Sequence, residues 1–409
     1  MRHKILPLVL CAVLTLCSAC GKKPKETAET PESKPEAVTE TAEINEPIVG
    51  IWFSYLEYQS LCQGMNEEQF SAFCDQAVEN MKSIGINRMY LHAVAFTDAF
   101  YDSKIYPATN VLPGIDYDPF LIFSKKARAS GIKVEAWINP MRSYTVEEMA
   151  ELPKDFIIRK WVSENNERVR QSGTRYYLNP AYPEVRELIV SAVKELMENY
   201  EIDGIHMDDY FYPYGTEKNF DAYIYSLAQE ENPELTLEEF RTANTDQMVR
   251  EIHDAVKAKD PNLVFDISPA GNIENCLTLL FANPYHWAEE NLVDYISPQI
   301  YWGYLHPVKP FEPTLEEWLH VVEGTGVALV PGLAAYRIGT AENVSSSEDA
   351  NKEFQNNDDM MARQIQTSLE KGCKGIVFFS YGSFFAPDGE VTEIVEKEII
   401  HIKTLAGLN

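Results

Sequence analysis

The feature that most constrains the fold is an alternation, from Ile48 onward, of short β-branched or aromatic runs with longer amphipathic stretches. Each short run ends in polar or aromatic residues, which is typical of parallel β/α architecture. The runs are Val49–Ser54, Arg88–Ala93, Lys133–Asn139, Gly204–Asp208, Leu263–Ser268, Tyr295–Trp302, Val327–Leu333 and Gly375–Tyr381. Because eight parallel strands close a barrel, the sequence predicts an α/β fold of the (β/α)8 TIM barrel type.

The segments between these runs have helical periodicity and helix-ending signals. The clearest predicted helices are Glu67–Gly85, Pro119–Gly131, Glu184–Tyr200 and Thr242–Lys259. A barrel needs about 250 residues, so a domain over 47–409 leaves a surplus for extended loops. The surplus falls after strand ends, at Thr97–Asp118, Ser143–Pro183, Tyr210–Leu237 and Arg337–Asp359, with short helices as an alternative in parts of the second and third. We expect these loops at the C-terminal face, where barrel enzymes build active sites.

The N-terminus has the pattern of an export signal. Basic residues precede an apolar run, Ile5 to Leu16, that is too short to span a bilayer, and small residues follow it. We therefore expect residues 1–19 to be a signal peptide. Ser-Ala-Cys-Gly around Cys20 resembles a bacterial lipoprotein box, which implies lipidation of Cys20 and a membrane anchor; secretion without lipid is the alternative. Residues 20–46, rich in Pro, Glu, Thr and Lys, are predicted to be a disordered tether.

Charge and cysteine usage narrow the class of protein. Lys+Arg 35 against Asp+Glu 63 gives a net charge of −28, which argues against nucleic acid as a partner. Four cysteines remain in the body of the chain: Cys62, Cys74, Cys276 and Cys373. Their spacing fits neither a metal site nor a disulfide scaffold, so we expect buried free thiols, with pairing of Cys62 and Cys74 left open.

The fourth strand carries the most informative motif, the run from Asp203 to Pro213, Asp-Gly-Ile-His-Met-Asp-Asp-Tyr-Phe-Tyr-Pro. Strand alternation places His206 and Asp208 inside the barrel, with Asp208 at the upper mouth. Asp209 belongs to the opposite face unless the chain turns at the strand end. Cleavage of an acetal needs a carboxylate beside the anomeric carbon and an acid for the leaving oxygen, and Asp208 suits one of these roles.

The third strand offers further candidates. Alternation sets Glu135, Trp137 and Asn139 on the inner face, with Glu135 deeper by about 6–7 Å. Trp137 suits the apolar face of a sugar, and Asn139 and Arg142 suit hydroxyl or acyl oxygens. Glu135 is either a proton-transfer partner of Asp208 or a supporting residue.

Other strand ends add acidic, polar and aromatic side chains, a convergence that favours a ligand site. Asp266 on the fifth strand is the competing acid. The predicted substrate-binding set is His92, Trp137, Asn139, Arg142, His206, Tyr210, Gln299, Tyr301, Trp302 and Tyr381.

Several signatures are absent from the sequence. It has no Gly-rich phosphate loop, HExxH pair, CxxC pair or G-x-S-x-G elbow. His92, His206, Asp208 and Asp266 are the residue types that ligate Zn or Mn, but no pair has the spacing of a dedicated metal site. We expect neither a metal nor another cofactor.

Four motifs carry a family resemblance: Gly-Ile-Trp-Phe-Ser, Glu-Ala-Trp-Ile-Asn-Pro-Met-Arg, the Asp-Asp-Tyr-Phe-Tyr-Pro block and Ser-Pro-Gln-Ile-Tyr-Trp. Over about residues 48–400 the chain resembles bacterial glycosyl-hydrolase-like family ten lipoproteins. The resemblance implies a barrel hydrolase of peptidoglycan strands that lack stem peptides. The chain also resembles, more distantly, α-amylase and α-galactosidase barrels. In those barrels the strand-four carboxylate is the nucleophile, and this resemblance implies the same role for Asp208. The amylase pattern has Arg where this chain has His206, and a Glu ending strand five that is missing here.

The leading hypothesis is a glycosidase acting on an envelope polysaccharide, with Asp208 as nucleophile or principal carboxylate and Asp209, Glu135 or Asp266 as its proton-transfer partner. The first alternative is a carbohydrate-binding barrel without catalysis. The second is a metal-dependent polysaccharide deacetylase. The oligomeric state, the sugar and the linkage stay open.

Overall fold

The computed structural model describes residues 46–408. The predicted signal peptide, Cys20 and nearly all of the predicted tether lie outside the described residues. Within 46–408, no helix combines the length and the apolar character that crossing a membrane requires.

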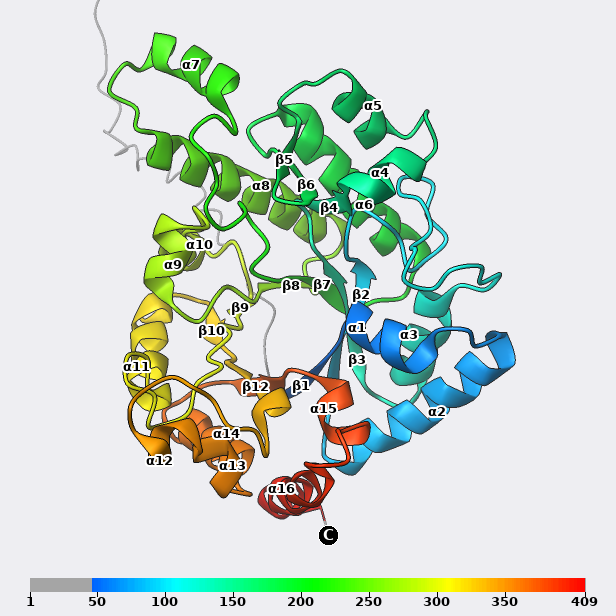
Figure 1. Cartoon of the computed structure of the whole chain (residues 1–409), viewed down its shortest axis with the longest axis vertical. Coiled ribbons are helices and arrows are strands. Elements are labelled where there is room, and N and C mark those ends of the chain that lie inside the picture. The colour runs from blue at the N-terminus through cyan, green and yellow to red at the C-terminus, as the bar shows by residue number, and fades with distance from the viewer. Residues whose placement is uncertain (1–45, 409) are drawn as a thin grey trace, which may run out of the picture. The chain divides into compact units, whose positions relative to one another are not determined.

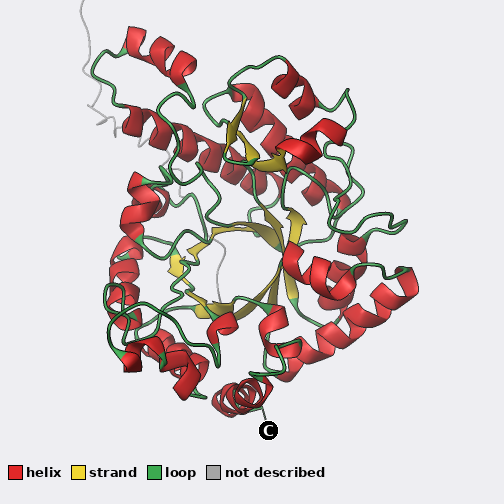
Figure 2. Cartoon of the chain, in the orientation of Figure 1, coloured by secondary structure: helices red, strands yellow, loops and turns green. Residues whose placement is uncertain are grey.

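The centre of the domain is a parallel sheet whose strands surround a common axis (Figures 1 and 2). Its strand order is β10-β9-β8-β7-β3-β2-β1-β12-β11. β10 and β11 are two pieces of one run, 328–333, and they pair with β9 and β12, so this run completes the ring. The strands are β1 (Ile48–Phe53), β2 (Arg88–Val94), β3 (Lys133–Ile138), β7 (Gly204–Met207), β8 (Val264–Ile267), β9 (Tyr295–Ile296), β10 (Ala328–Leu329), β11 (Gly332–Leu333) and β12 (Gly375–Phe378).

Helices cover the outside of this ring (Figure 2). The longer ones are α2 (Glu67–Ser83), α3 (Pro119–Ala129), α6 (Pro183–Asn199), α8 (Leu237–Lys259), α11 (Phe311–Val322), α14 (Met360–Glu370) and α16 (Thr392–Leu405). Capping boxes begin two of them, with Asn66 and Gln69 at α2 and Thr236 and Glu239 at α8. The four predicted helices are confirmed, α8 beginning five residues earlier than expected.

The loops between these helices and strands contain several short elements. They are α1 (Tyr55–Glu57), a π-helix (Tyr58–Cys62), α9 (Ile273–Thr278), α10 (Pro284–Glu289), a 3-10 helix (Ala335–Arg337) and α15 (Tyr381–Phe385). The (β/α)8 barrel predicted from the sequence is thus the observed fold, with its sixth and seventh strands much shorter than expected.

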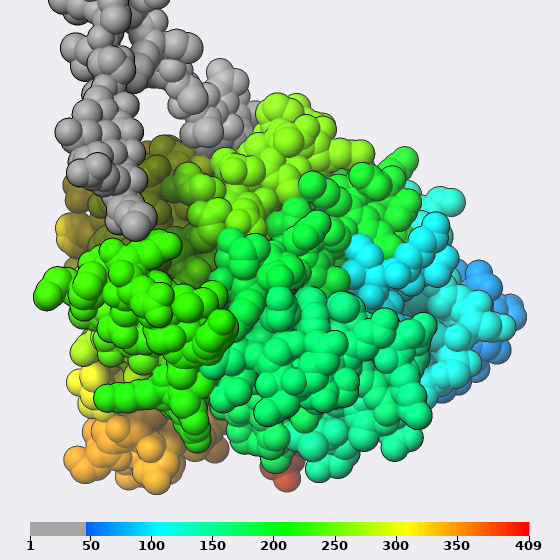
Figure 3. All heavy atoms as spheres, turned by 90° about the horizontal axis from the view of Figure 1, so that it is seen from above, coloured from blue at the N-terminus to red at the C-terminus, as the bar shows by residue number. Residues whose placement is uncertain are grey.

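The long loops follow the carboxyl ends of strands, as expected, but the second one holds more structure than the sequence suggested. It contains α4 (Val146–Glu151), α5 (Ile157–Ser163) and an antiparallel sheet, β4-β6-β5, made of β4 (Arg142–Thr145), β5 (Val169–Ser172) and β6 (Arg175–Leu178). The third holds α7 (Ala222–Glu231), and the fourth holds α12 (Glu348–Asn351) and α13 (Glu353–Asn356). The second and third loops lie side by side at the surface (Figure 3), joined by hydrogen bonds from the Tyr223 amide to Glu167.

Strand alternation divides the buried residues into two cores. The larger lies between strands and helices and contains side chains such as Ile205 and Met207. The smaller lies inside the ring and contains Ile48, Trp52, Tyr90, Trp137, Val264, Tyr295, Val330 and Val377. Cys62, Cys74, Cys276 and Cys373 are free and buried, which confirms the expectation of free thiols and leaves Cys62 and Cys74 unpaired.

Candidate active site

A cavity of about 230 Å³ opens where the barrel strands end. Its walls come from the carboxyl ends of β1, β2, β3, β7, β8 and β12 and from the segments that follow β9 and β11. The lining residues are Trp52, Ser54, Tyr55, Leu56, His92, Trp137, Asn139, Asp208, Asp209, Tyr210, Ser268, Gln299, Tyr301, Tyr336 and Phe379. Seven of the predicted site residues beyond Asp208 are therefore brought together here: His92, Trp137, Asn139, Asp209, Tyr210, Gln299 and Tyr301.

Asp208 follows directly after β7 and lies at the cavity floor, almost fully buried. Both of its carboxyl oxygens accept hydrogen bonds. The Trp137 indole Nε1–H donates to Oδ2 at 3.2 Å, and the Tyr210 backbone N–H donates to Oδ1 at 3.1 Å. Burial raises the pKa of Asp208, and repulsion from Asp209 adds to this; the N–H donors and the Arg142 charge act in the opposite direction. The two donors hold the carboxyl group in one orientation at the cavity wall.

Asp209 also lines the cavity, although continued strand alternation would place it on the opposite face. The reason is that β7 ends at Met207, so the chain turns before position 209. Burial raises the pKa of Asp209 to about 6, while a hydrogen bond with the Gln299 side chain opposes the shift. Two adjacent carboxyl groups with different surroundings thus face one cavity, an arrangement that suits division into an acid and a base.

His92 and Trp137 form a stacked wall of the cavity. Their ring centroids are 3.8 Å apart at an interplanar angle of 11°. The Tyr55 backbone N–H donates to His92 Nδ1 at 3.2 Å, so the proton of the neutral ring is on Nε2. Burial and the nearby Arg142 charge lower the pKa of His92, and Nε2 has no hydrogen-bond partner among the described residues. This N–H is therefore a buried donor that none of the described residues pairs.

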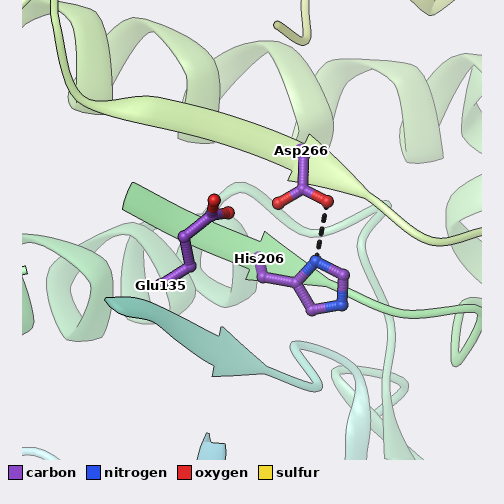
Figure 4. Close-up of side chains that lie close together, drawn as sticks. All are labelled: Glu135, His206 and Asp266. Carbon is purple, nitrogen blue, oxygen red and sulfur yellow. Dashed lines mark hydrogen bonds and ion pairs between the residues drawn. The ribbon is translucent and has the colours of Figure 1, made fainter. Parts of the chain in front are cut away.

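Below the cavity floor lies a polar cluster of Glu135, His206 and Asp266, inside the ring (Figure 4). His206 Nε2 accepts the Trp52 indole N–H at 2.9 Å, and its Nδ1 lies 2.8 Å from Asp266 Oδ2, to which it donates. Burial lowers the pKa of His206 to about 3, so the ring is neutral. None of the three lines the cavity. The structure therefore places two candidate acids and one candidate substrate-binding residue in a layer that supports the site from beneath.

The same three residues are the described cluster whose atoms are close enough to ligate a metal. Their hydrogen bonds do not fit that role, because both ring nitrogens of His206 are engaged and leave no free lone pair. Glu135 pairs with the Arg88 guanidinium and accepts from the Tyr295 hydroxyl. Because Arg88 already neutralises Glu135 and His206 Nδ1 carries a proton, the cluster is a hydrogen-bonded network and not a metal coordination shell.

Arg142 stands behind the cavity wall rather than in it. Its guanidinium carbon is 4.1 Å from the centre of the Tyr210 ring and 4.6 Å from that of Phe96. These distances indicate cation–π contacts on two rings. The Arg142 side chain therefore supports Tyr210, and its charge acts on Asp208 and Asp209 through space.

Two predicted substrate-binding residues lie elsewhere. Trp302 lies six residues beyond the end of β9, and its ring packs against the outer core and near His306. Tyr381 begins α15 after β12 has ended at Phe378, and its hydroxyl accepts from Asn80 on α2. Strand alternation does not continue as far as either position, which is why both predictions were wrong about the cavity.

The prediction missed Trp52, Ser54, Tyr55, Leu56, Ser268, Tyr336 and Phe379 as lining residues. Strand alternation could have identified four of them as inward-facing: Trp52 and Ser54 on the first strand, Ser268 on the fifth and Phe379 on the eighth. Tyr55, Leu56 and Tyr336 lie in short helical turns beyond strand ends, where no sequence periodicity indicates direction.

The chain is 27% identical over 381 residues to glycosyl hydrolase DigH of Escherichia coli strain K12, covering 83% of this chain and 84% of that protein. It is 29% identical over 285 residues to glycosyl hydrolase YngK of Bacillus subtilis strain 168, covering 64% of this chain and 55% of that protein.

Solved structures with the same fold include two glycosidase domains of low sequence identity. The PgaB (BpsB) glycoside hydrolase domain of Bordetella bronchiseptica aligns with a TM-score of 0.55 at 13% identity, over 86% of this chain and 98% of that one. An endo-1,4-β-mannanase of Rhizomucor miehei aligns with a TM-score of 0.54 at 11% identity, over 88% and 95%. The family model described as glycosyl hydrolase-like 10 matches residues 47–351, and the chain belongs to this family.

Proposed function

We propose that this protein is a glycosidase that cleaves a polysaccharide in the cavity above Asp208. The observation that carries the proposal is the pair of adjacent carboxyl groups, Asp208 and Asp209, in an aromatic-lined cavity at the carboxyl ends of the barrel strands. Aromatic rings bind the apolar faces of sugars, and two carboxyl groups supply the acid and the carboxylate that acetal cleavage needs. The names of the relatives and the fold of the solved glycosidases support the same reaction class.

We assign the principal carboxylate to Asp208 and the proton transfer to Asp209. Asp208 accepts two N–H hydrogen bonds, which oppose the rise that burial causes in its pKa and fix the orientation of its carboxyl group. Asp209 is less buried and has a pKa raised to about 6, so it holds a proton in mildly acidic solution and can release it to a leaving oxygen. Glu135 and Asp266 then act indirectly, through the buried layer.

We propose peptidoglycan glycan strands without stem peptides as the substrate. The support is the family resemblance of the sequence motifs together with the export signal expected at residues 1–19, which would bring the barrel to the cell envelope. Purified peptidoglycan with and without stem peptides is therefore the first substrate pair to test.

The experiment compares the unchanged protein with Asp208→Asn by mass spectrometry of the released glycan products. We expect the rate of cleavage to fall by at least about a hundredfold, because the variant keeps the shape but loses the charge. The melting temperature should stay nearly the same. Asp254→Asn, a change of an exposed carboxylate on α8, is the matched control and should cleave normally.

Two outcomes would contradict the proposal. Full activity of Asp208→Asn would remove Asp208 from the mechanism. Tight glycan binding with no product from the unchanged protein would instead mean a binding barrel. Cleavage that survives a chelator would argue against a metal-dependent deacetylase.

A further inference from the structure

A second cavity, of about 430 Å³, lies beside the first at the same face of the barrel. It is lined by residues that follow the carboxyl ends of β11, β12 and β1: Tyr336 and Thr340, Ser380 and Ser383, and Glu57. The two cavities share Tyr336. A long ligand that occupies the first cavity over Asp208 can therefore extend past the Tyr336 ring into the second cavity.

Tyr336 is suited to lie under such a ligand because its ring is both exposed and held. The residue is 45% exposed, and its ring centroid lies 5.8 Å from that of Tyr301 and 6.1 Å from that of Phe379. Its backbone N–H donates to the Phe379 carbonyl at 3.1 Å. Arg337 Nε donates to the Tyr336 hydroxyl at 3.3 Å. Fixing an aromatic ring before binding lowers the entropy lost when a ligand covers it.

The polar groups of the second cavity limit what it can bind. Asp388 and Glu390 line it with exposed carboxyl groups, whereas the buried Glu57 already accepts hydrogen bonds from Ser54 and Ser380. None of the described lining residues is Lys, Arg or His. The nearby Arg337 pairs with Glu342. An anionic group would be repelled here, whereas sugar hydroxyls can donate to carboxylate and hydroxyl oxygens.

We propose that the second cavity binds an uncharged sugar unit of the same glycan whose neighbouring units occupy the first cavity, with Tyr336 supporting the chain between them. This rests on the proposed function only in taking a glycan as the ligand, and it adds a subsite that makes binding depend on chain length.

The test measures binding of uncharged β-1,4-linked N-acetylglucosamine oligomers, a dimer and a hexamer, by isothermal titration calorimetry. All proteins carry Asp208→Asn so that the oligomers stay intact. The key variant is Ala386→Trp, because Ala386 is exposed and lines the second cavity but not the first. We expect it to weaken hexamer binding by about tenfold and to leave dimer binding unchanged, since only the hexamer reaches the filled cavity.

Tyr336→Ala should also weaken hexamer binding more than dimer binding, and Tyr336→Phe should retain it. Tyr285→Ala is the control, because this tyrosine on α10 is similarly exposed, at 39%, and lines neither cavity. Equal affinity of the Asp208→Asn protein for dimer and hexamer, or an unchanged hexamer affinity in Ala386→Trp, would overturn the inference. Loss of cleavage has no bearing on these affinities, so failure of the proposed hydrolysis is recognised separately.

Discussion

Arg88 supplies the positive charge that faces Glu135 in the buried layer beneath the cavity. Glu135 is completely buried, and burial together with the neighbouring Asp266 raises its pKa. The Arg88 guanidinium, itself buried, opposes this shift and pairs with the carboxylate. Tyr295 donates to the same carboxylate from the opposite side of the ring. The Glu135 carboxylate thus has one cationic partner, Arg88, and one hydroxyl donor, Tyr295.

We predict that Arg88→Met lowers the free energy of unfolding by about 3–5 kcal/mol, because it leaves Glu135 buried without its countercharge. Urea denaturation measures this. In the double variant with Glu135→Gln the loss should be clearly smaller, since the Glu135 charge is then removed together with its countercharge. Equal losses in the single and double variants would mean that the guanidinium contributes packing rather than charge.

The pKa of Asp209 predicts the pH dependence of the site. Its value in the folded protein is about 6, above the ordinary value of 3.8. If Asp209 donates the proton, the rate of cleavage falls as pH rises through about 6. Asp209→Asn should lack activity at every pH unless the leaving group needs no acid. An alkaline limb far above pH 6 would assign the proton to another group.

The same shift has a consequence for stability with a definite sign. Between pH 3.8 and about 6 the folded state binds more protons at Asp209 than the unfolded state does. The contribution of this group to stability is therefore present at low pH and is lost as pH rises through that window.

At the scale of elements, β7 and β8 approach so closely that only glycine fits at position 204. A Cβ there would lie 2.4 Å from the Val264 carbonyl oxygen. We predict that Gly204→Ala lowers the free energy of unfolding by about 1–3 kcal/mol through overpacking. Gly389→Ala is the control, since nothing lies within 4 Å of its Cβ position. A melting temperature that is the same in both variants would contradict this.

Element patterns also show how much the sequence could predict. Alternation was a reliable guide within strands, and it correctly placed Trp137 and Asn139 because both adjoin a regular strand. It failed where the regular backbone ends early, as at Trp302, six residues beyond the end of β9. The burial of His206 beneath the cavity depends on its contacts with β1 and β8, which are remote in sequence and leave no local pattern.

At the scale of the whole molecule, the barrel could be predicted from the sequence but one part of its loops could not. The fold follows from the recurrence of strands and helices over the full length of the domain. The small antiparallel sheet β4-β6-β5 could not be predicted in this way, because its strands are four residues long and lack a clear alternation.

We propose that the barrel is attached to a membrane through a lipid on Cys20.

We predict that the full-length protein, expressed in a bacterium, incorporates radiolabelled palmitate and that Cys20→Ala does not. The thioether lipid of a lipoprotein needs the cysteine sulfur, so the substitution removes the attachment point. Export of both forms without label would mean secretion by cleavage alone. Cys276→Ala, which alters a buried thiol, should keep the label.

The break in run 328–333 shortens two strands without opening the barrel wall. Pro331 separates β10 from β11 and has no amide hydrogen, and β9 beside them has only two residues. Backbone hydrogen bonds nevertheless continue across the break: the amides of Ala328, Val330 and Gly332 donate to the carbonyls of Asp294, Ile296 and Pro298. The ring therefore stays closed here although its regular strands are short. Gln299 and Tyr301, which line the cavity, therefore project from a wall that is hydrogen-bonded to its neighbours on both sides.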